Sequence, residues 1–538
     1  MTGNISKEKR DKLLSKIADI KKFMHNNNAD PSFLGYLNEL QNEISSKKYG
    51  LVYEEHREEI DEILDNNEPI FVEQEKYLIP SGKVNFLLEG DNLASLRLLE
   101  KTHKEKFDVI YIDPPYNTGN NDFTYNDKNV DSSDSYKHSK WISFMNQRIK
   151  IAYNLLAKDG VMFISIDDNE QSHLKMLCDE IFGENLVEQY IWCLQDKSEG
   201  SFVKTAGLTV RKEHEYIIAC FKNIGKKFKR YPGTRDFSEG SFSNPDNDPR
   251  GPWFSGNISR NGITSTTGSK YYTITNPAGE NFTRNWTLSR EEYQEALKDN
   301  RIFFAKGGAG VPRLKIFANE PIEIIQSSLF NDVHTSITGK NELKKLFDGV
   351  SPFSFPKPPS LIERLIRISS SNNALVLDFF AGSGTTAQAV MQLNKEDGGN
   401  RQFILCTNNE NDICEKVTFE RIKRVIEREN FQEGLKYFKI DYVDKKDKVY
   451  YEYADELINH ITELVELENA IDFRNNKAID IALTDEKLDE ILSNEKTLKD
   501  IKKIYLGHDI LMSQKQAMIL NKNNIEYVII PNYYYSEK

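Results

Sequence analysis

Two hydrophobic patterns alternate along most of this chain. Short apolar runs rich in β-branched residues are typical of buried strands, and they are found at 84–92, 107–112, 161–166, 215–221, 374–380 and 400–406. Elsewhere apolar residues recur every three or four positions, which predicts helices at 93–99, 141–156, 174–182, 361–368 and 387–393. Strands that alternate with helices form βαβ units, so we expect an α/β fold around a parallel sheet.

Three segments depart from this alternation. Residues 1–75 have an amphipathic helical pattern, which suits either an assembly surface or a covering layer. From about 222 to 345, Gly, Asn, Ser and Thr dominate among scattered aromatic residues, and the alternation is lost. From about 440 the chain is acidic, which suits a protein partner better than DNA, although a solvated outer face explains it as well.

Composition narrows the class of protein. A chain of 538 residues with 38% hydrophobic and 29% charged residues is long enough for two or three domains with a real core. It contains no apolar run long enough to cross a membrane, and its first residues do not resemble a signal peptide. The five scattered cysteines show neither a paired framework nor metal-binding spacing, so we expect free thiols in a reducing cytoplasm. The net charge of -12 excludes a protein that is basic all over, but not one with a local basic face.

The strand at 107–112 leads into the first candidate site, Asp113-Pro114-Pro115-Tyr116. Neither proline can donate a hydrogen bond to a sheet, so Asp113 is held at the carboxyl end of the strand with Tyr116 just beyond it. Ligands of open α/β sheets bind at that edge. An isolated Asp-Pro-Pro sequence can be only a turn, but the strand before it and the tyrosine after it favour a chemical role.

A second candidate site follows the strand at 374–380. Gly382 and Gly384 allow a ligand to approach the backbone, and the helix that follows offers free N–H groups at its N-terminus. The glycine pattern is weak evidence for a nucleotide-like ligand, and the absence of a following Lys-Ser/Thr pair excludes a P-loop. Glu410 lies just past the next strand, where an acid can bind ribose hydroxyls or simply face solvent.

Together these motifs resemble those of a known family. Asp113-Pro114-Pro115-Tyr116 resembles the catalytic motif of DNA amino-methyltransferases, and Asp378-Phe379-Phe380-Ala381-Gly382-Ser383-Gly384 resembles their S-adenosylmethionine motif. The catalytic motif comes first, as in the β class, and Phe355-Pro356-Lys357-Pro358 is similar to a further cofactor-contacting segment of that class. Tyr49-Gly50-Leu51-Val52-Tyr53-Glu54-Glu55 and Gly339-Lys340-Asn341-Glu342-Leu343 resemble modification subunits of type III restriction systems.

The resemblance implies an S-adenosylmethionine-dependent methyltransferase (Rossmann-like) sheet with an inserted target-recognition domain. It implies methyl transfer from S-adenosylmethionine to adenine N6 in double-stranded DNA. The cofactor-binding residues would be Asp378, Phe379, Phe380, Ala381, Gly382, Gly384, Thr385, Lys357, Glu410 and Asp91, the last of them near the cofactor adenine. The motif begins with Asp rather than Ser, which resembles adenine enzymes; N4-cytosine methylation and a non-catalytic DNA-binding protein remain the alternatives.

The chemistry agrees with these residue types. Adenine N6 is a poor nucleophile because its lone pair is delocalised into the ring. A carboxylate at Asp113 and the carbonyl of Pro114, accepting its two N–H bonds, would direct that lone pair towards a sulfonium methyl group. Pro114 and Pro115 make the turn rigid, and Tyr116 offers a ring on which an extruded base can stack. Catalysis then depends on orientation and electrostatics and requires no metal.

The segment from 222 carries a basic cluster. Lys226, Lys227, Lys229 and Arg230 precede a series in which basic and aromatic residues are interleaved: Arg250, Trp253, Arg260, Tyr271, Tyr272, Arg284, Trp286, Arg301 and Arg313. Cations for phosphates and flat rings for bases are typical of nucleic-acid binding, so we expect DNA contacts here. The alternative is a solvated insert of irregular strands.

These observations predict five parts. They are an N-terminal helical segment (1–75), the catalytic half of the methyltransferase domain (76–221), a target-recognition domain (222–345), the cofactor half (346–439) and a C-terminal domain (440–538). The type III resemblance and the helical N-terminal segment suggest a homodimer, with a restriction (helicase-nuclease) subunit as a further partner. A solitary modification enzyme is the alternative.

Overall fold

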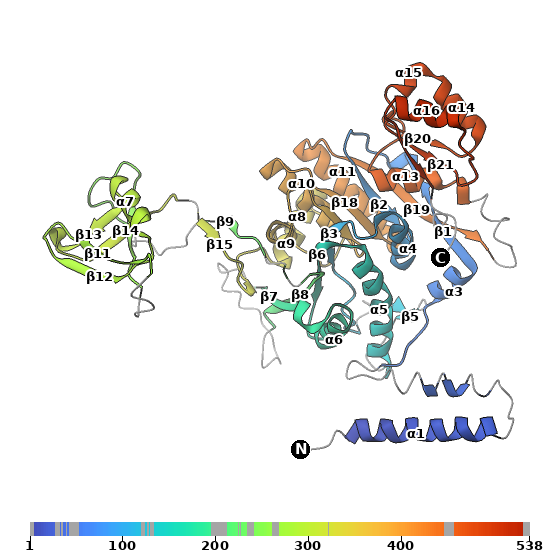
Figure 1. Cartoon of the computed structure of the whole chain (residues 1–538), viewed down its shortest axis with the longest axis horizontal. Helices are drawn as coiled ribbons and strands as arrows, with labels where there is room; N and C mark the ends of the chain where they lie inside the picture. The colour runs from blue at the N-terminus through green and yellow to red at the C-terminus, as the bar shows by residue number, and fades with distance from the viewer. Residues whose placement is uncertain are drawn as a thin grey trace. The chain divides into compact units, whose positions relative to one another are not determined.

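The computed structural model describes residues 5–26, 33, 36–38, 40–41, 53–119, 124–125, 128–129, 134–194, 212–223, 225, 228–233, 242–260, 268–320, 322–445 and 457–530. The chain divides into two compact units, one made of residues 1–227 with 328–538 and the other of residues 228–327. The larger unit contains the α/β sheet, and the smaller unit consists mainly of short strands (Figure 1).

Ten strands in the described part of the larger unit form one mixed sheet. They are β1 (Asn67–Glu73), β2 (Val84–Glu89), β3 (Phe107–Ile112), β6 (Leu156–Ile166), β7 (Val187–Cys193), β8 (His214–Phe221), β16 (Leu329–Phe330), β17 (Leu375–Asp378), β18 (Gln402–Thr407) and β19 (Gly434–Asp444). Their order across the sheet is β1-β19-β2-β18-β17-β3-β6-β8-β7-β16. The run from β19 to β6 is parallel, which confirms the predicted α/β fold, while β1 and β8 pair antiparallel to its two ends.

The winding of the sheet reverses between β3 and β17. These strands are parallel neighbours, with Val376 opposite Val109 and Leu377 opposite Ile110. From β3 the chain continues to β6 on one side, and from β17 it continues to β18 on the other. Ligands of open α/β sheets bind at such a reversal, outside the carboxyl ends of the strands. Asp113 and Asp378 therefore stand at the same topological switch point.

Helices cover both faces of the sheet, because right-handed crossovers in opposite directions leave their helices on opposite faces (Figure 1). One layer contains α4 (Asn92–His103), α5 (Lys137–Leu155), α6 (Gln171–Phe182) and α13 (Ile461–Asn469). The other contains α8 (Ser336–Leu346), α9 (Pro359–Ser369), α10 (Thr385–Asp397) and α11 (Glu420–Glu429). The 3₁₀ turns η1 (Glu75–Tyr77), η2 (Glu184–Leu186) and η4 (Glu410–Asp412) and the π-helix η5 (Ile413–Phe419) connect these elements.

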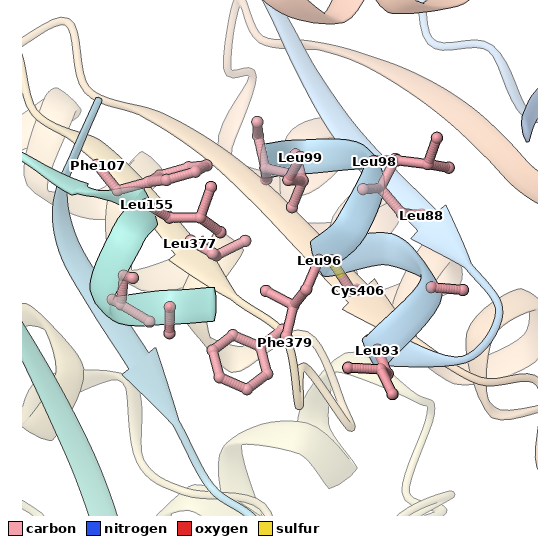
Figure 2. Close-up of a cluster of buried hydrophobic side chains, with 14 of the residues drawn as sticks. Leu88, Leu93, Leu96, Leu98, Leu99, Phe107, Leu155, Leu377, Phe379 and Cys406 are labelled. Atoms are coloured by element: carbon pink, nitrogen blue, oxygen red, sulfur yellow. The ribbon is translucent and has the colours of Figure 1, made fainter. Parts of the chain in front are cut away.

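The leucines of α4 form the centre of the core. Figure 2 shows Leu96 beside Phe379, with Leu93 and Leu99 among the other buried side chains of this cluster. Burying a leucine side chain contributes about 1.5–3 kcal/mol, so this helix is held mainly by its apolar face. Asp91 caps the helix: its Oδ1 accepts a hydrogen bond of 2.7 Å from the backbone N–H of Leu93.

The segments near the two ends of the chain contain strands as well as helices. Helices α1 (Ile5–Asn26) and α3 (Glu59–Asn66) fit the expected pattern, but helical structure ends at Asn66, because the next residues form β1 and bury Phe71. Near the other end, strands β20 (Ile479–Ala482), β21 (Lys503–Leu506) and β22 (Glu526–Ile529) form a small parallel sheet with α14 (Asp485–Ser493), α15 (Glu495–Leu498) and α16 (Gln514–Lys522). Among the described helices, none is long and apolar enough to cross a membrane.

The smaller unit has its own core. It contains β9 (Tyr231–Gly233), β10 (Trp253–Asn257), β11 (Tyr271–Thr275), β12 (Asn281–Asn285), α7 (Arg290–Lys298), β13 (Ile302–Phe304), η3 (Lys306–Gly308), β14 (Pro312–Phe317) and β15 (Ile322–Ile324). Tyr272 and Trp286 belong to this core, and Trp253 is also buried. The expectation that these three rings stack on bases is therefore wrong. Along a strand, alternate side chains face inward, and the aromatic residues of this unit stabilise the fold.

Candidate active site

The two sequence motifs meet in one pocket at the switch point. Its lining includes Asp113, after β3, and Lys357, before α9. From the second motif, the pocket is lined by Asp378, Phe380, Ala381, Gly382, Ser383 and Thr385. Four residues predicted to bind the cofactor do not line it: Phe379, Gly384, Glu410 and Asp91. Phe379 is instead buried in the core beneath the turn (Figure 2).

Asp113 is part of a compact polar network. One oxygen of its carboxylate, Oδ1, accepts a hydrogen bond from the Tyr116 hydroxyl at 3.0 Å and lies 2.9 Å from Nζ of Lys357. Glu215, on β8, repeats this arrangement: its Oε2 is 3.0 Å from the Tyr116 hydroxyl and 3.3 Å from Nζ of Lys357. Lys357 also donates to the Tyr116 hydroxyl at 2.7 Å. Sequence reasoning missed Glu215, because nothing in the pattern of β8 relates it to residues 99 positions away.

The charges of this network oppose the effect of burial. Burial alone would lower the pKa of the Lys357 ammonium, but the nearby carboxylates of Asp113 and Glu215 outweigh it and raise that pKa above its usual value. Burial also raises the pKa of the Tyr116 hydroxyl, and the same two carboxylates raise it further. Lys357 is therefore a cation at neutral pH, and Tyr116 is a neutral hydroxyl that donates hydrogen bonds.

The loop after the motif is anchored from behind. Asn117 has a left-handed backbone with φ of 56°, and its amide donates to Glu170 at 2.5 Å. Nδ1 of His138 lies 2.6 Å and Nδ1 of His173 2.8 Å from the two oxygens of that carboxylate. Burial raises the pKa of Glu170 to about 7. These side chains hold the turn that presents Tyr116.

The same cluster includes residue types that ligate metal ions. The ligand atoms of His138, Glu170 and His173 lie within 4.8 Å of one another. As they stand, both imidazoles are within hydrogen-bonding distance of the buried carboxylate, so hydrogen bonds can satisfy it without a cation.

The glycine turn has the backbone that the sequence predicts. Gly382 and Gly384 have φ values of 49° and 77°, in the left-handed region that favours glycine. Asp378 ends β17 below the turn, and its carboxylate accepts hydrogen bonds from the backbone N–H of Phe380 at 3.0 Å and from the Thr386 hydroxyl at 2.6 Å. Burial raises the pKa of Asp378 to about 7. This pocket therefore holds a carboxyl group that titrates near neutral pH.

A buried arginine supports this turn from α11. Arg421 donates to the hydroxyls of Ser383 at 2.9 Å and Thr385 at 2.6 Å, and to Gln388 at 3.0 Å. Burial lowers its pKa to about 10, which still leaves the guanidinium charged at neutral pH. Sequence reasoning missed Arg421, because it lies in an amphipathic helix where an arginine usually faces solvent.

The remaining predicted residues lie elsewhere. Asp91 caps α4 and lies 3.7 Å from Arg148, and Glu410 is exposed just after β18. Lys226 and Lys227 lie outside the described residues. In the smaller unit Lys229 and Arg230 are exposed, and Arg230 lies 3.7 Å from Glu323.

Comparison with known proteins decides the family. The DNA methylase family matches residues 107–421, more than half of the chain, and this range begins with β3 and ends at Arg421. The chain belongs to the DNA methylase family. Both motifs of this methylase, and the Lys357 and Glu215 side chains that join them, lie within the matched range.

Several curated proteins resemble this methylase. The Mod subunit of the type III restriction-modification enzyme StyLTI from Salmonella typhimurium is 35% identical over 63% of this chain and 55% of that subunit. The EcoPI Mod subunit of Escherichia phage P1 is 32% identical over 61% of this chain and 58% of its own length. The type II methyltransferase M.KpnI from Klebsiella pneumoniae is 32% identical over 66% of this chain and 90% of its own length. The methylase thus matches little more than half the length of these two type III relatives.

Proposed function

We propose that this protein transfers a methyl group from S-adenosylmethionine to adenine N6 in double-stranded DNA, on a base flipped out of the helix. One observation carries the proposal: Asp113 and the glycine turn at 382–384, far apart in sequence, lie together at the switch point of the sheet. Membership of the DNA methylase family supports it independently.

The turn fits the cofactor that the resemblance implies. A Cβ at Gly382 would lie 3.3 Å from the ring of Phe353, which also lines the pocket, so a side chain there would narrow the space. Asp378 offers a carboxylate for a cationic ligand, and α10 begins directly after Gly384 with its free N–H groups. When bound, S-adenosylmethionine would supply an electrophilic methyl group. Lys357 also lines this pocket, and its ammonium group contacts the carboxylate of Asp113.

Asp113 would then orient the amine. Its Oδ1 accepts from Tyr116 and Lys357, whereas Oδ2 has no hydrogen-bond partner among the described residues. We assign Oδ2 and the carbonyl of Pro114 to the two N–H bonds of the amine, which directs the nitrogen lone pair at the methyl group. Pro115 is held in place because the indole N–H of Trp141 donates to its carbonyl at 2.7 Å. A preorganised turn spends little energy on reorganisation when the base arrives.

Product analysis tests this function. The full chain is incubated with S-adenosylmethionine carrying a labelled methyl group and with DNA, and the DNA is then digested to nucleosides. Label in N6-methyl-2′-deoxyadenosine supports the proposal. Label in N4-methyl-2′-deoxycytidine would assign the alternative reaction, and DNA binding without any label would indicate a binding protein. Sequencing the methylated DNA then gives the recognition site.

The type III relatives suggest a second level of organisation. We infer that the protein is a modification subunit that acts in the cytoplasm as a homodimer and recruits a restriction (helicase-nuclease) subunit. Its similarity to the StyLTI and EcoPI Mod subunits supports this, as does α1, where Leu13, Ile20 and Phe23 are exposed. Light scattering on the full chain should give twice the chain mass of 62.2 kDa. Full activity in a sample that is monomeric at every concentration would instead favour a solitary enzyme.

A further inference from the structure

Two carboxylates in the active site share the same two partners. Asp113 leaves β3 and Glu215 lies on β8, yet both contact the hydroxyl of Tyr116 at 3.0 Å. Both also lie near Nζ of Lys357, at 2.9 and 3.3 Å. The network around Tyr116 and Lys357 therefore contains two carboxylates, one ammonium group and one hydroxyl proton. Only one of the acids, Asp113, belongs to the motif at the end of β3.

Tyr116 and Lys357 can each donate hydrogen bonds to either of the two carboxylates. A tyrosine hydroxyl has a single proton, so Tyr116 can donate to only one of the two carboxylates at a time. Lys357 has three N–H bonds and is in reach of all three oxygens, and its side chain is only 8% exposed. A buried ammonium without a counter-ion is strongly disfavoured. If Asp113 were its only partner, neutralising Asp113 would leave that ammonium unpaired.

Methyl transfer releases a proton at this position. The N6 lone pair forms the bond to the methyl carbon while the carbon–sulfur bond breaks and its electron pair stays on sulfur. One N6 proton then passes to Oδ2 of Asp113, and its bonding pair returns to nitrogen. Asp113 becomes neutral in this step. The buried ammonium group of Lys357 then lacks a counter-ion unless a second carboxylate lies nearby.

We propose that Glu215 is this anion: a positioning residue that keeps Lys357 and Tyr116 paired while Asp113 takes up the amine proton. The inference rests on the proposed methyl transfer. Before transfer, Glu215 draws the ammonium and the hydroxyl partly away from Asp113, which leaves Asp113 the stronger acceptor for the amine. After transfer, both donors turn to Glu215. Without Glu215, Lys357 and Tyr116 would bind Asp113 alone and weaken it as a base.

Among the described residues, Tyr111 and Asp378 are two further ionisable groups that interact with Asp113. Tyr111, on β3, has a pKa raised by burial and stays neutral. Asp378, at the end of β17, has a pKa raised by burial to about 7. Glu215 adds a little to the raised pKa of Tyr111, but burial is the main cause, so Tyr111 stays neutral in a Glu215 variant. The ratio of variant to wild-type rate at each pH therefore isolates the effect of Glu215.

The test measures single-turnover methylation of DNA by the full chain between pH 5.5 and 9. Glu215→Gln keeps the shape of the side chain but removes its charge. Cofactor affinity by calorimetry and DNA affinity by fluorescence anisotropy should stay within about twofold of wild type. The rate at pH 7.5 should fall about tenfold or more, as expected for a perturbed general base. The acidic limb of the pH profile should move to lower pH by about one unit, the shift that an opposite charge produces.

Glu213→Gln is the matched control, because Glu213 is an exposed acid two residues before Glu215. It should leave both the rate and the pH profile unchanged. A Glu215→Gln variant with wild-type rates would overturn the proposal. A variant slowed by the same factor at every pH would also overturn it, because that result indicates a purely structural role.

A second variant covers failure of Glu215→Gln to fold. Glu215→Asp keeps the charge on a shorter side chain, so the proposal requires a wild-type acidic limb even if the rate falls. A shifted limb in Glu215→Asp would contradict it. If the wild-type chain transfers no methyl group to DNA, the proposed function fails. If the wild-type chain is active and the Glu215 variants are equally active, only the proposal about Glu215 fails.

Discussion

Lys357 shows, at the scale of single residues, how much a role depends on partners that are distant in the sequence. Its place in Phe355-Pro356-Lys357-Pro358 predicts a contact with the cofactor, and its side chain does line the pocket. The structure also brings its ammonium to Tyr116, 241 positions away, and to Asp113. No local pattern encodes these contacts, because Lys357 precedes α9, which packs against β3 only in the folded chain. Sequence reasoning could therefore identify the residue but not its partners.

Asp378 gives a prediction at the same scale. Its pKa, raised to about 7 by burial, means that the carboxyl group is neutral below pH 7 and charged above it. A negative charge in the pocket favours a cationic ligand, so the affinity for S-adenosylmethionine should rise severalfold between pH 6 and 8. Asp378→Asn should bind more weakly at pH 8 and lose this pH dependence. Calorimetry at a series of pH values measures both effects.

Glu363 is the control for this experiment. Burial raises its pKa to about 7 as well, but it lies on α9 and does not line the pocket. Glu363→Gln should keep the wild-type dependence of affinity on pH. If Asp378→Asn retains the full dependence, another group is responsible for it.

At the scale of elements, the sequence predicts the central strands better than the peripheral ones. The strands β3, β6 and β17 each contain an uninterrupted apolar run, at 109–112, 161–164 and 375–377, because these parts of the strands are almost entirely buried on both faces. Strand β19 was missed, since its pattern includes charged residues such as Lys436, which is buried beside Glu466. Strand β7 was missed because it mixes exposed and buried positions. Such strands depend on partners from other parts of the chain and have weak patterns of their own.

The glycine turn gives a prediction at this scale. Gly384 and Gly398, at the two ends of α10, both have positive φ. A Cβ at Gly384 would lie 3.2 Å from Cγ2 of Thr418, whereas a Cβ at Gly398 would meet nothing within 4 Å. Gly398→Ala should lower the free energy of unfolding by about 1–2 kcal/mol through backbone strain alone and leave cofactor affinity unchanged. Gly384→Ala should lower it further and also weaken cofactor binding.

Denaturant unfolding and calorimetry on the two variants measure these effects. Equal losses of stability with unchanged affinity in both would mean that the turn tolerates a side chain, and that the cofactor binds elsewhere.

At the scale of the whole molecule, the smaller unit is the predicted site of DNA recognition. The sequence predicts this domain at 222–345, whereas the smaller unit spans residues 228–327 and residues 328–345 belong to the larger unit. Composition also could not distinguish the core of this unit from its surface. Trp286 is fully buried, and Arg250 is paired with Asp248 and Asp299. The exposed cations, among them Arg230 and Arg313, are what the unit can offer to phosphates.

Arg230→Glu tests this assignment. If Arg230 contacts a phosphate, the variant should bind all DNA sequences more weakly, and the slope of log affinity against log salt should fall by about one. Lys496→Glu, an exposed charge reversal near the small C-terminal sheet, is the control and should change neither quantity. Both quantities are measured by fluorescence anisotropy at salt concentrations from about 50 to 300 mM, where phosphate contacts make the affinity strongly dependent on salt. Wild-type affinity and slope in Arg230→Glu would place the DNA on other residues.

The central claim is that Asp113 prepares the target amine for methyl transfer. Single-turnover methylation by Asp113→Ala tests it most directly, with cofactor and DNA binding measured on the same sample. The segment from Asp378 to Thr385, which contains the glycine turn, is unchanged in this variant, so S-adenosylmethionine and DNA should still bind. The loss of one preorganised hydrogen-bond acceptor should lower the rate by a hundredfold or more, or about 3–4 kcal/mol. A variant that binds both ligands and transfers methyl groups at nearly the wild-type rate would contradict the account.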